Sequence, residues 1–340
     1  MKKKSNERKI LNLIYDESKY AEVIESERPD FKISHKFSCL LFGIEVTEFY
    51  NSESNARLKN IPDYFNEIIY QGHYRHKVDK TILKTDEVKI ISADGEVKEI
   101  TRGICQKLPK HEEYANLVAN KIQLKGQKFS GYDKNLDHIN LIIFDTEHQF
   151  NLIPIDQFYR YFYNTQVKEV LFASMFREIF FITVLNKNRK VYIPLKMLLL
   201  LAEYYLFGKI LMEYPWETLG DKFYIENNNP ISESLMRLFN KYLRAKTDKV
   251  YWRDKEGAVE VILGGCGIVI KEDHKLFIRS YSDYKLPDDI HIVEGDGITT
   301  FFSSEEFRDK EKKILANTSF FTELVFDIID YPKNKKIIAF

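Results

Sequence analysis

Cysteine is scarce in this chain, and charge of one sign is not in excess. The 340 residues include three cysteines, Cys39, Cys105 and Cys266, which are too few and too widely spaced for a disulfide framework or a zinc site. This usage predicts a reducing, cytoplasmic location. Basic and acidic residues number 51 each, so no overall field attracts nucleic acid, and a polyanion would have to bind a local basic patch.

Long apolar runs and nucleotide-binding glycine motifs are also missing. Charged residues interrupt the most apolar segment, 194–212, which predicts a buried helix and no membrane partner. The basic N-terminus has no apolar run of the kind that a signal peptide carries. The glycines at 264–267 are not followed by the Lys-Ser or Lys-Thr of a phosphate-binding loop, so we interpret them as a bend.

The chain does contain enough apolar material for a large core. Hydrophobic residues make up 44% and aromatic residues 14% of the sequence, which predicts a folded protein. We predict a mixed α/β fold of the α+β type in two parts, residues 1–150 and residues 151–340. The second part is either a separate domain or an extension of the first core, and its role stays open.

Each part has its own predicted order of elements. In the first we expect a helix over 6–25, a hairpin over 31–49, helical segments over 51–75, a polar hairpin over 80–105, a helix over 111–130 and a buried strand over 140–145. In the second we expect a hairpin over 178–193 below a helix at 194–213, a helix over 232–246, short strands over 251–302 and a helix near 303–317.

Two carboxylates mark the first hairpin. Asp30 stands directly before the first strand, and Glu45 lies in the almost continuously apolar second strand. A buried carboxylate is costly unless it is paired, and two carboxylates on neighbouring strands are suitable ligands for a hard divalent cation. The helix over 6–25 adds Glu7 and Glu17 near its apolar face; these are either surface acids or one of them points toward the cation site.

The helix over 111–130 has an unusual distribution of charge. Lys121, Lys125 and Lys128 lie within about 60° of one another and are flanked by apolar residues, whereas neutral polar residues take the opposite side. A solvated lysine face would normally show the reverse arrangement. Two interpretations stay open: the lysine stems cover apolar surface, or the lysines form a basic ridge that faces a site.

These residues resemble the PD-(D/E)xK nuclease superfamily, which has the restriction-endonuclease-like fold. The match is Pro29-Asp30, fourteen intervening residues and then Glu45-Val46-Thr47, within a helix, hairpin, helix and strand over roughly residues 5–150. The resemblance implies an αβββαβ core in which Asp30, Glu45 and the Val46 carbonyl bind Mg²⁺, or alternatively Mn²⁺. Glu7, or in second place Glu17, would be the accessory acid of the helix.

Thr47 departs from the motif, because a lysine is expected there. Many members of the superfamily move this lysine to the following helix, which directs attention to the three lysines of 111–130. We select Lys125, since it lies nearest the Val118–Ile122 flank that is expected to pack on the sheet. Lys121, Lys128 and Thr47 remain accessory candidates.

The resemblance implies a Mg²⁺-dependent endonuclease acting on nucleic acid, with DNA favoured, similar to bacterial restriction or phage-defence effectors. Candidate phosphate contacts are Lys2–Lys4, Arg75–Lys77, and the group Lys241, Arg244 and Lys246. The alternative is a module on the same fold that binds nucleic acid or protein and has lost catalysis, for which Thr47 is the main argument. A third hypothesis is an unrelated protein in which the two acids are accidental. A homodimer is left open.

Overall fold

The computed structural model of the chain describes residues 2–185, 189–213, 231–255, 257–271 and 276–316. Helices and strands alternate irregularly along these residues, and the strands form more than one sheet. This arrangement confirms the predicted α+β class. Among the described helices, none is both long and apolar enough to cross a membrane.

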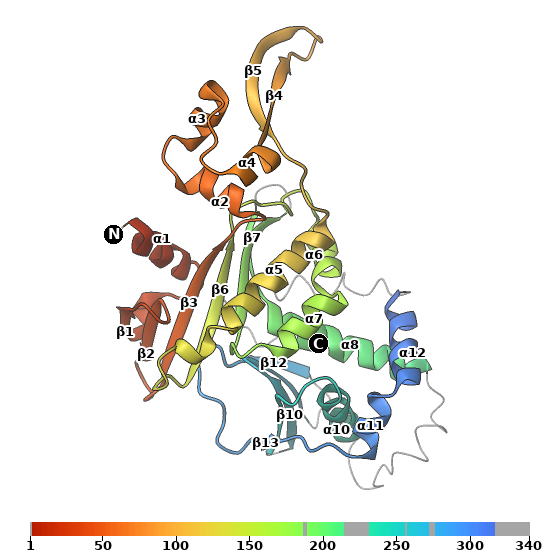
Figure 1. Cartoon of the computed structure of the whole chain (residues 1–340). Coiled ribbons are helices and arrows are strands. Elements are labelled where there is room, and N and C mark those ends of the chain that lie inside the picture. Colours follow the sequence, from red (N-terminus) through yellow and green to blue (C-terminus); the bar gives the residue numbers. More distant parts are fainter. Residues whose placement is uncertain (1, 186–188, 214–230, 256, 272–275, 317–340) are drawn as a thin grey trace.

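A six-stranded sheet carries the predicted motif (Figure 1). Its strands, in spatial order, are β1 (Tyr20–Glu25), β2 (Phe31–His35), β3 (Leu41–Phe49), β6 (His138–Asp145), β7 (Ile179–Leu185) and β8 (Arg189–Pro194). Strand β2 is antiparallel to both of its neighbours, β1 and β3. Strands β3, β6 and β7 run parallel, and β8 is antiparallel to β7. The predicted hairpin over 31–49 and the predicted strand over 140–145 are therefore confirmed.

Two helices lie on opposite sides of this sheet, α1 (Lys2–Leu11) and α5 (His111–Gly126) (Figure 1). Side chains alternate along a strand, and β3 sends Ile44 and Val46 into the core cluster that includes α1. Phe49 packs in the other cluster, which includes the buried face of α5. Glu45 and Phe49 are four residues apart, so their side chains lie on the same face of β3. This is the face that α5 covers.

The predicted helix over 6–25 is wrong beyond its first half. The helix ends at Leu11, a short 3₁₀ turn follows at Glu17–Lys19, and residues 20–25 form β1. Asp16 starts the turn by accepting a hydrogen bond from the Ser18 amide at 3.0 Å. The strand is stabilised by pairing with β2, with Val23 opposite Ile33. Apolar spacing alone could not reveal this pairing, because it depends on a neighbouring strand.

An insertion between β3 and α5 projects from the end of the sheet (Figure 1). It consists of α2 (Glu53–Asn60), α3 (Tyr64–Gln71), α4 (Lys77–Ile82) and the two-stranded hairpin of β4 (Lys84–Ile91) and β5 (Val97–Cys105). The polar hairpin predicted over 80–105 is thus confirmed. A small cluster of its own, including Tyr64, Ile68 and Leu83, forms the core of the insertion.

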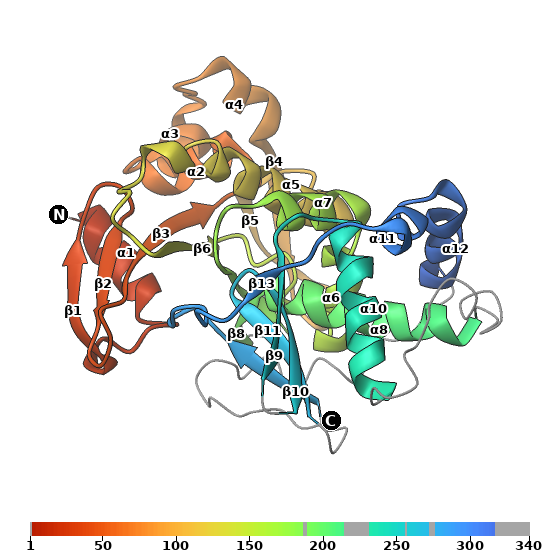
Figure 2. The same cartoon turned by 90° about the horizontal axis from the view of Figure 1, so that it is seen from below.

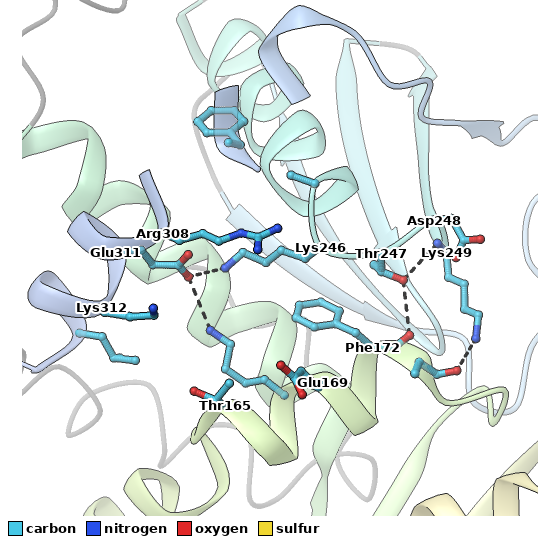
Figure 3. A pocket seen from close by; sticks show the side chains of 15 residues that line it. Thr165, Glu169, Phe172, Lys246, Thr247, Asp248, Lys249, Arg308, Glu311 and Lys312 are labelled. Atoms are coloured by element: carbon cyan, nitrogen blue, oxygen red, sulfur yellow. Dashed lines mark hydrogen bonds and ion pairs between the residues drawn. The ribbon is translucent and has the colours of Figure 1, made fainter. Parts of the chain in front are cut away.

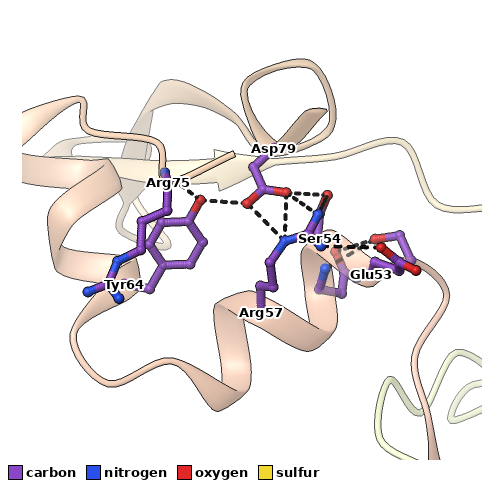
Figure 4. A network of polar contacts seen from close by, with 8 residues as sticks. Glu53, Ser54, Arg57, Tyr64, Arg75 and Asp79 are labelled. Carbon is purple, nitrogen blue, oxygen red and sulfur yellow. Dashed lines mark hydrogen bonds and ion pairs between the residues drawn. The ribbon is translucent and has the colours of Figure 1, made fainter. Parts of the chain in front are cut away.

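Asp79 joins the three helices of the insertion (Figure 4). Its carboxylate is fully buried and accepts hydrogen bonds from Ser54 Oγ at 2.7 Å, Arg57 Nη2 at 2.6 Å and Tyr64 Oη at 2.6 Å. Burial by itself would raise the pKa of Asp79, but the bonds from Arg57, Tyr64 and Ser54 outweigh it and lower the pKa to about 2. Asp79 is a fully satisfied structural carboxylate.

The sheet continues past the predicted boundary at residue 150. Strand β7 pairs with β6 through Leu141 and Ile179, so β7 and β8 extend the first core. The long helix α8 (Leu195–Glu213) is buried, as predicted. The turn of the predicted hairpin, 186–188, lies outside the described residues, as does the end of the second part, 317–340.

The remainder forms a second layer (Figure 2). Helices α6 (Ile155–Phe162) and α7 (Thr165–Ala173) pack against α5. A five-stranded sheet follows, with β9 (Val250–Lys255), β10 (Ala258–Leu263), β11 (Cys266–Lys271), β12 (Leu276–Ser280) and β13 (His291–Ile292). The other helices of this part are α10 (Ile231–Arg244), which contacts the sheet, α11 (Gly297–Phe302) and α12 (Glu305–Ala316). The segment after β12 contacts the first sheet, where Asn140 Nδ2 donates to the Ser282 carbonyl at 2.6 Å.

Candidate active site

Asp30 lies where the ladder between β2 and β3 ends. The last pair of that ladder is Phe31 with Ile44, and the buried Asp30 carboxylate continues it by accepting the Val46 amide at Oδ2, at 2.8 Å. The N–H and C=O of one strand residue point to the same edge. The Val46 carbonyl therefore faces the same edge as Asp30.

Glu45 is buried on the neighbouring strand, and Lys125 Nζ donates to its Oε1 at 2.5 Å. Burial raises the pKa of the Glu45 carboxyl, and the negative charge of Asp30 raises it further. Lys125 and a hydrogen bond from Tyr132 act in the opposite direction without cancelling the shift. The charge of one predicted metal ligand, Asp30, therefore acts on the other, Glu45.

The orientation of α5 agrees with the prediction from the sequence. Val118 and Ile122 are buried against the sheet, and Lys125 is the lysine of the ridge that reaches Glu45. Burial and the charges of Lys125 and Lys128 lower the pKa of Lys121. Within the described residues, no ion pair joins Lys121 or Lys128 to a carboxylate.

Helix α1 brings Glu7 to the site but not Glu17. Lys4 Nζ lies 3.2 Å from Glu7 Oε2 and 3.1 Å from Asp30 Oδ1, so the ammonium group bridges the two carboxylates. Glu17 is instead held by Arg8, whose Nη2 lies 2.7 Å from Glu17 Oε2. The expectation that an acid of the first helix points toward the hairpin therefore holds for Glu7, whereas Glu17 is engaged elsewhere.

Thr47 lies two residues beyond Glu45 on the same face of β3 and is buried. Its hydroxyl donates to the Glu48 carbonyl at 3.4 Å and brings no charge to the site. The cation beside Glu45 comes from Lys125 on α5, eighty positions further along the chain.

Sequence reasoning missed two residues of this site. Lys4 was considered only as a phosphate contact, although its i,i+3 spacing to Glu7 is a signal for an ion pair. Tyr132 follows α5, and nothing in the local pattern connects it to Glu45. Both depend on contacts between distant segments.

The oxygen donors suit a hard cation. Asp30, Glu45 and the Val46 carbonyl are all oxygen ligands, which Mg²⁺ and Mn²⁺ prefer. In the part of the chain that the structure describes, no three side chains of His, Cys, Asp or Glu converge on one metal position, here or elsewhere. A metal ion bound here would therefore have two carboxylates, the Val46 carbonyl and water as ligands, a set that Mg²⁺ accepts.

A concave region lies in the C-terminal half (Figure 3). It is a pocket of about 920 Å³ between α7, the end of α10 and α12. Its deepest cations, Lys168 and Lys246, lie 2.6 and 2.7 Å from the two oxygens of Glu203, which is fully buried. Burial would raise the pKa of Glu203, but the two lysines outweigh it and lower the pKa. Glu311 pairs with the same lysines, so this charge network neutralises itself.

Several of the predicted phosphate contacts are already paired with carboxylates of the chain. Lys246 binds Glu203, Lys4 binds Asp30, and Arg75 lies 2.5 Å from Glu67. Of the aromatic residues near 158–163, Phe158, Phe162 and Tyr163 are buried in the main core, where they cannot stack on bases. The basic ridge of α5 is a better candidate surface for a phosphate backbone.

Comparisons with known proteins give no relative. No protein-family model matches the chain, and no curated protein or solved structure shows significant similarity to it.

Proposed function

We propose that this chain is a metal-dependent nuclease that hydrolyses phosphodiester bonds of nucleic acid. The observation that carries the proposal is the meeting of three segments distant in the sequence. Asp30 before β2, Glu45 on β3 and Lys125 on α5 lie where the ladder between β2 and β3 ends, with Lys125 Nζ 2.5 Å from Glu45 and the Val46 amide held by Asp30.

The order of the elements supports the same proposal. Helix α1, strands β1, β2 and β3, helix α5 and strand β6 follow one another in the order of the αβββαβ core of the PD-(D/E)xK superfamily. The insertion of α2–α4 and the β4–β5 hairpin interrupts this order at one place only, between β3 and α5. Because a fold alone does not define an activity, the proposal depends on Asp30, Glu45 and Lys125.

The chain's own residues have separable tasks in this reaction. Asp30, Glu45 and the Val46 carbonyl would hold Mg²⁺ or Mn²⁺, which would supply an activated water and neutralise charge on the phosphate. The Val46 amide fixes the Asp30 carboxylate, and Tyr132 restrains Glu45. Lys125 is the cation available to orient the attacking water and to stabilise negative charge that develops on the phosphate.

One observation favours the alternative, a binding module that has lost catalysis. The chain's own ammonium groups, Lys4 on Asp30 and Lys125 on Glu45, already neutralise part of the carboxylate charge, and Thr47 replaces the motif lysine. DNA as the preferred substrate and a role in restriction or antiviral defence rest on the resemblance alone.

The test is cleavage of plasmid, linear double-stranded, single-stranded and RNA substrates in Mg²⁺, Mn²⁺ or a chelator. We expect Asp30→Ala and Glu45→Ala to lower the cleavage rate by about 100-fold or more, because each removes a charged group that acts at the reacting phosphate. Glu48→Gln is the matched control, since Glu48 lies on the same strand and faces away from the site.

Equal cleavage by the wild type and both alanine variants would show that the activity is a contaminant and that the catalytic assignment is wrong. Binding of nucleic acid by the wild type without cleavage in any metal would support the binding module.

A further inference from the structure

Lys4 has the contacts of a cation held inside the proposed site. Its Nζ donates to the Ser26 carbonyl at 2.7 Å and lies 3.1 Å from Asp30 Oδ1 and 3.2 Å from Glu7 Oε2. A lysine side chain is ordinarily charged at neutral pH, so Lys4 brings a positive charge to these oxygens.

The neighbouring lysine shows that these contacts are specific to Lys4. Lys3 also approaches Glu7, at 3.4 Å, but its side chain is 87% exposed, against 24% for Lys4. Only Lys4 bridges the helix acid to Asp30. An exposed pair such as Lys3 with Glu7 contributes little, because water screens it.

A count of charges indicates competition. The candidate site contains the carboxylates of Glu7, Asp30 and Glu45 and the ammonium groups of Lys4 and Lys125. Together these five groups carry one net negative charge. A divalent cation added to this set would give a net positive charge, whereas a divalent cation that displaces Lys4 would give neutrality. Like charges within a few ångströms in a partly buried site repel strongly.

The two oxygens of Asp30 indicate where the exchange would occur. Oδ2 accepts the Val46 amide and is part of the strand arrangement, whereas Oδ1 carries only the Lys4 contact among the described residues. Because Lys4 Nζ also donates to the Ser26 carbonyl, it retains one partner when it leaves the carboxylates.

We propose that Lys4 is a built-in counter-ion, held by Asp30 Oδ1 and Glu7, that is displaced from Asp30 when this carboxylate binds a divalent metal ion. This inference rests on the proposed function, because it assumes that the carboxylates are metal ligands. In this view α1 sets the metal concentration at which the site becomes loaded.

The experiment measures binding of MgCl₂ and MnCl₂ to the full chain by calorimetry and by the metal-induced shift in Tm, without nucleic acid. Lys4→Met removes the charge, and Lys4→Gln removes the charge but keeps a donor for Ser26; circular dichroism verifies that each variant is folded. Lys3→Met is the matched control. We expect about tenfold tighter metal binding in both Lys4 variants, with a lower Tm without metal and a larger shift on adding it, and no change in Lys3→Met.

The counter-ion proposal is wrong if the wild type binds metal and the folded Lys4 variants bind it equally or more weakly. That result would leave the nuclease proposal standing. Absence of metal binding in the wild type and in all variants would overturn both.

Discussion

Two buried carboxylates in this protein, Asp79 of the insertion and Glu45 of the sheet, have pKa values shifted in opposite directions. Asp79 receives an arginine and two hydroxyl groups, which overcome the cost of burial and lower its pKa to about 2. Glu45 has Lys125 and Tyr132, but burial and the charge of Asp30 raise its pKa. The comparison shows that burial does not identify a functional acid. The difference lies in the neighbours: donors surround Asp79, whereas the charge of a second carboxylate acts on Glu45.

The largest expected effect is a loss of stability on substitution of Asp79. Asp79→Asn removes the charge that pairs with Arg57 in the interior, and breaking a buried pair from one side costs about 3–5 kcal/mol. Glu45→Gln should change the free energy of unfolding without metal by less than about 1 kcal/mol, since it also removes the repulsion from Asp30. Chemical denaturation measures both changes, and hydrogen exchange of α2–α4 locates the effect of Asp79→Asn.

The pH dependence gives a control for this prediction. Because the pKa of Asp79 is lowered on folding, its contribution is fully present above the ordinary pKa of 3.8 and is lost as the pH falls toward about 2. Equal destabilisation by Asp79→Asn and Glu45→Gln at neutral pH would contradict the distinction between the two acids.

The next effect concerns the lysines of α5. Lys125→Ala should lower the rate of nucleic-acid cleavage by about 100-fold to 1000-fold, because Lys125 is the lysine that reaches the carboxylates. Lys121→Ala and Lys128→Ala are matched controls on the same ridge and should cost less than about tenfold, as expected for loss of a phosphate contact. If either control is more damaging than Lys125→Ala, the selection of Lys125 is wrong.

The smallest effect is the pH dependence of metal binding. A proton and a metal ion compete for Glu45, and its pKa is raised above the ordinary 4.5, so affinity should increase as the pH rises through this shifted value. Below it, affinity should fall by up to about tenfold per pH unit. Calorimetric titration with MnCl₂ between pH 5 and 8 measures the effect, and Glu45→Gln should remove most of it. Equal pH dependence of metal affinity in the wild type and in Glu45→Gln would mean that Glu45 is not a ligand.

Much of the site was predictable because its signals are local. A carboxylate within an apolar strand and lysines within an apolar arc of a helix are visible as violations of alternation and of helical periodicity. These violations led to Asp30, Glu45 and Lys125, and the structure brings Glu45 and Lys125 together. The orientation of α5 followed from the same periodicity, through Val118 and Ile122.

The failures share one cause. The end of α1 and the existence of β1 depend on pairing with β2, and the exclusion of Glu17 depends on Arg8 reaching it after the chain has turned. For residues 151–340 the sequence left a separate domain or an extension of the first core open. The sheet continues past residue 150 because β7 pairs with β6, and no change in composition indicates this pairing.

By itself, the sequence determined the α+β class, the first hairpin, the face that α5 turns to the sheet and the identity of the unusual acids and lysines, since each depends on spacing within one element. Only the tertiary structure decided that Lys4 bridges Glu7 and Asp30, that Tyr132 restrains Glu45, and that the partners outweigh burial at Asp79 but not at Glu45. The physical reason is that a carboxylate's pKa and partners are set by charges and donors within a few ångströms, and here these come from segments that folding alone brings together.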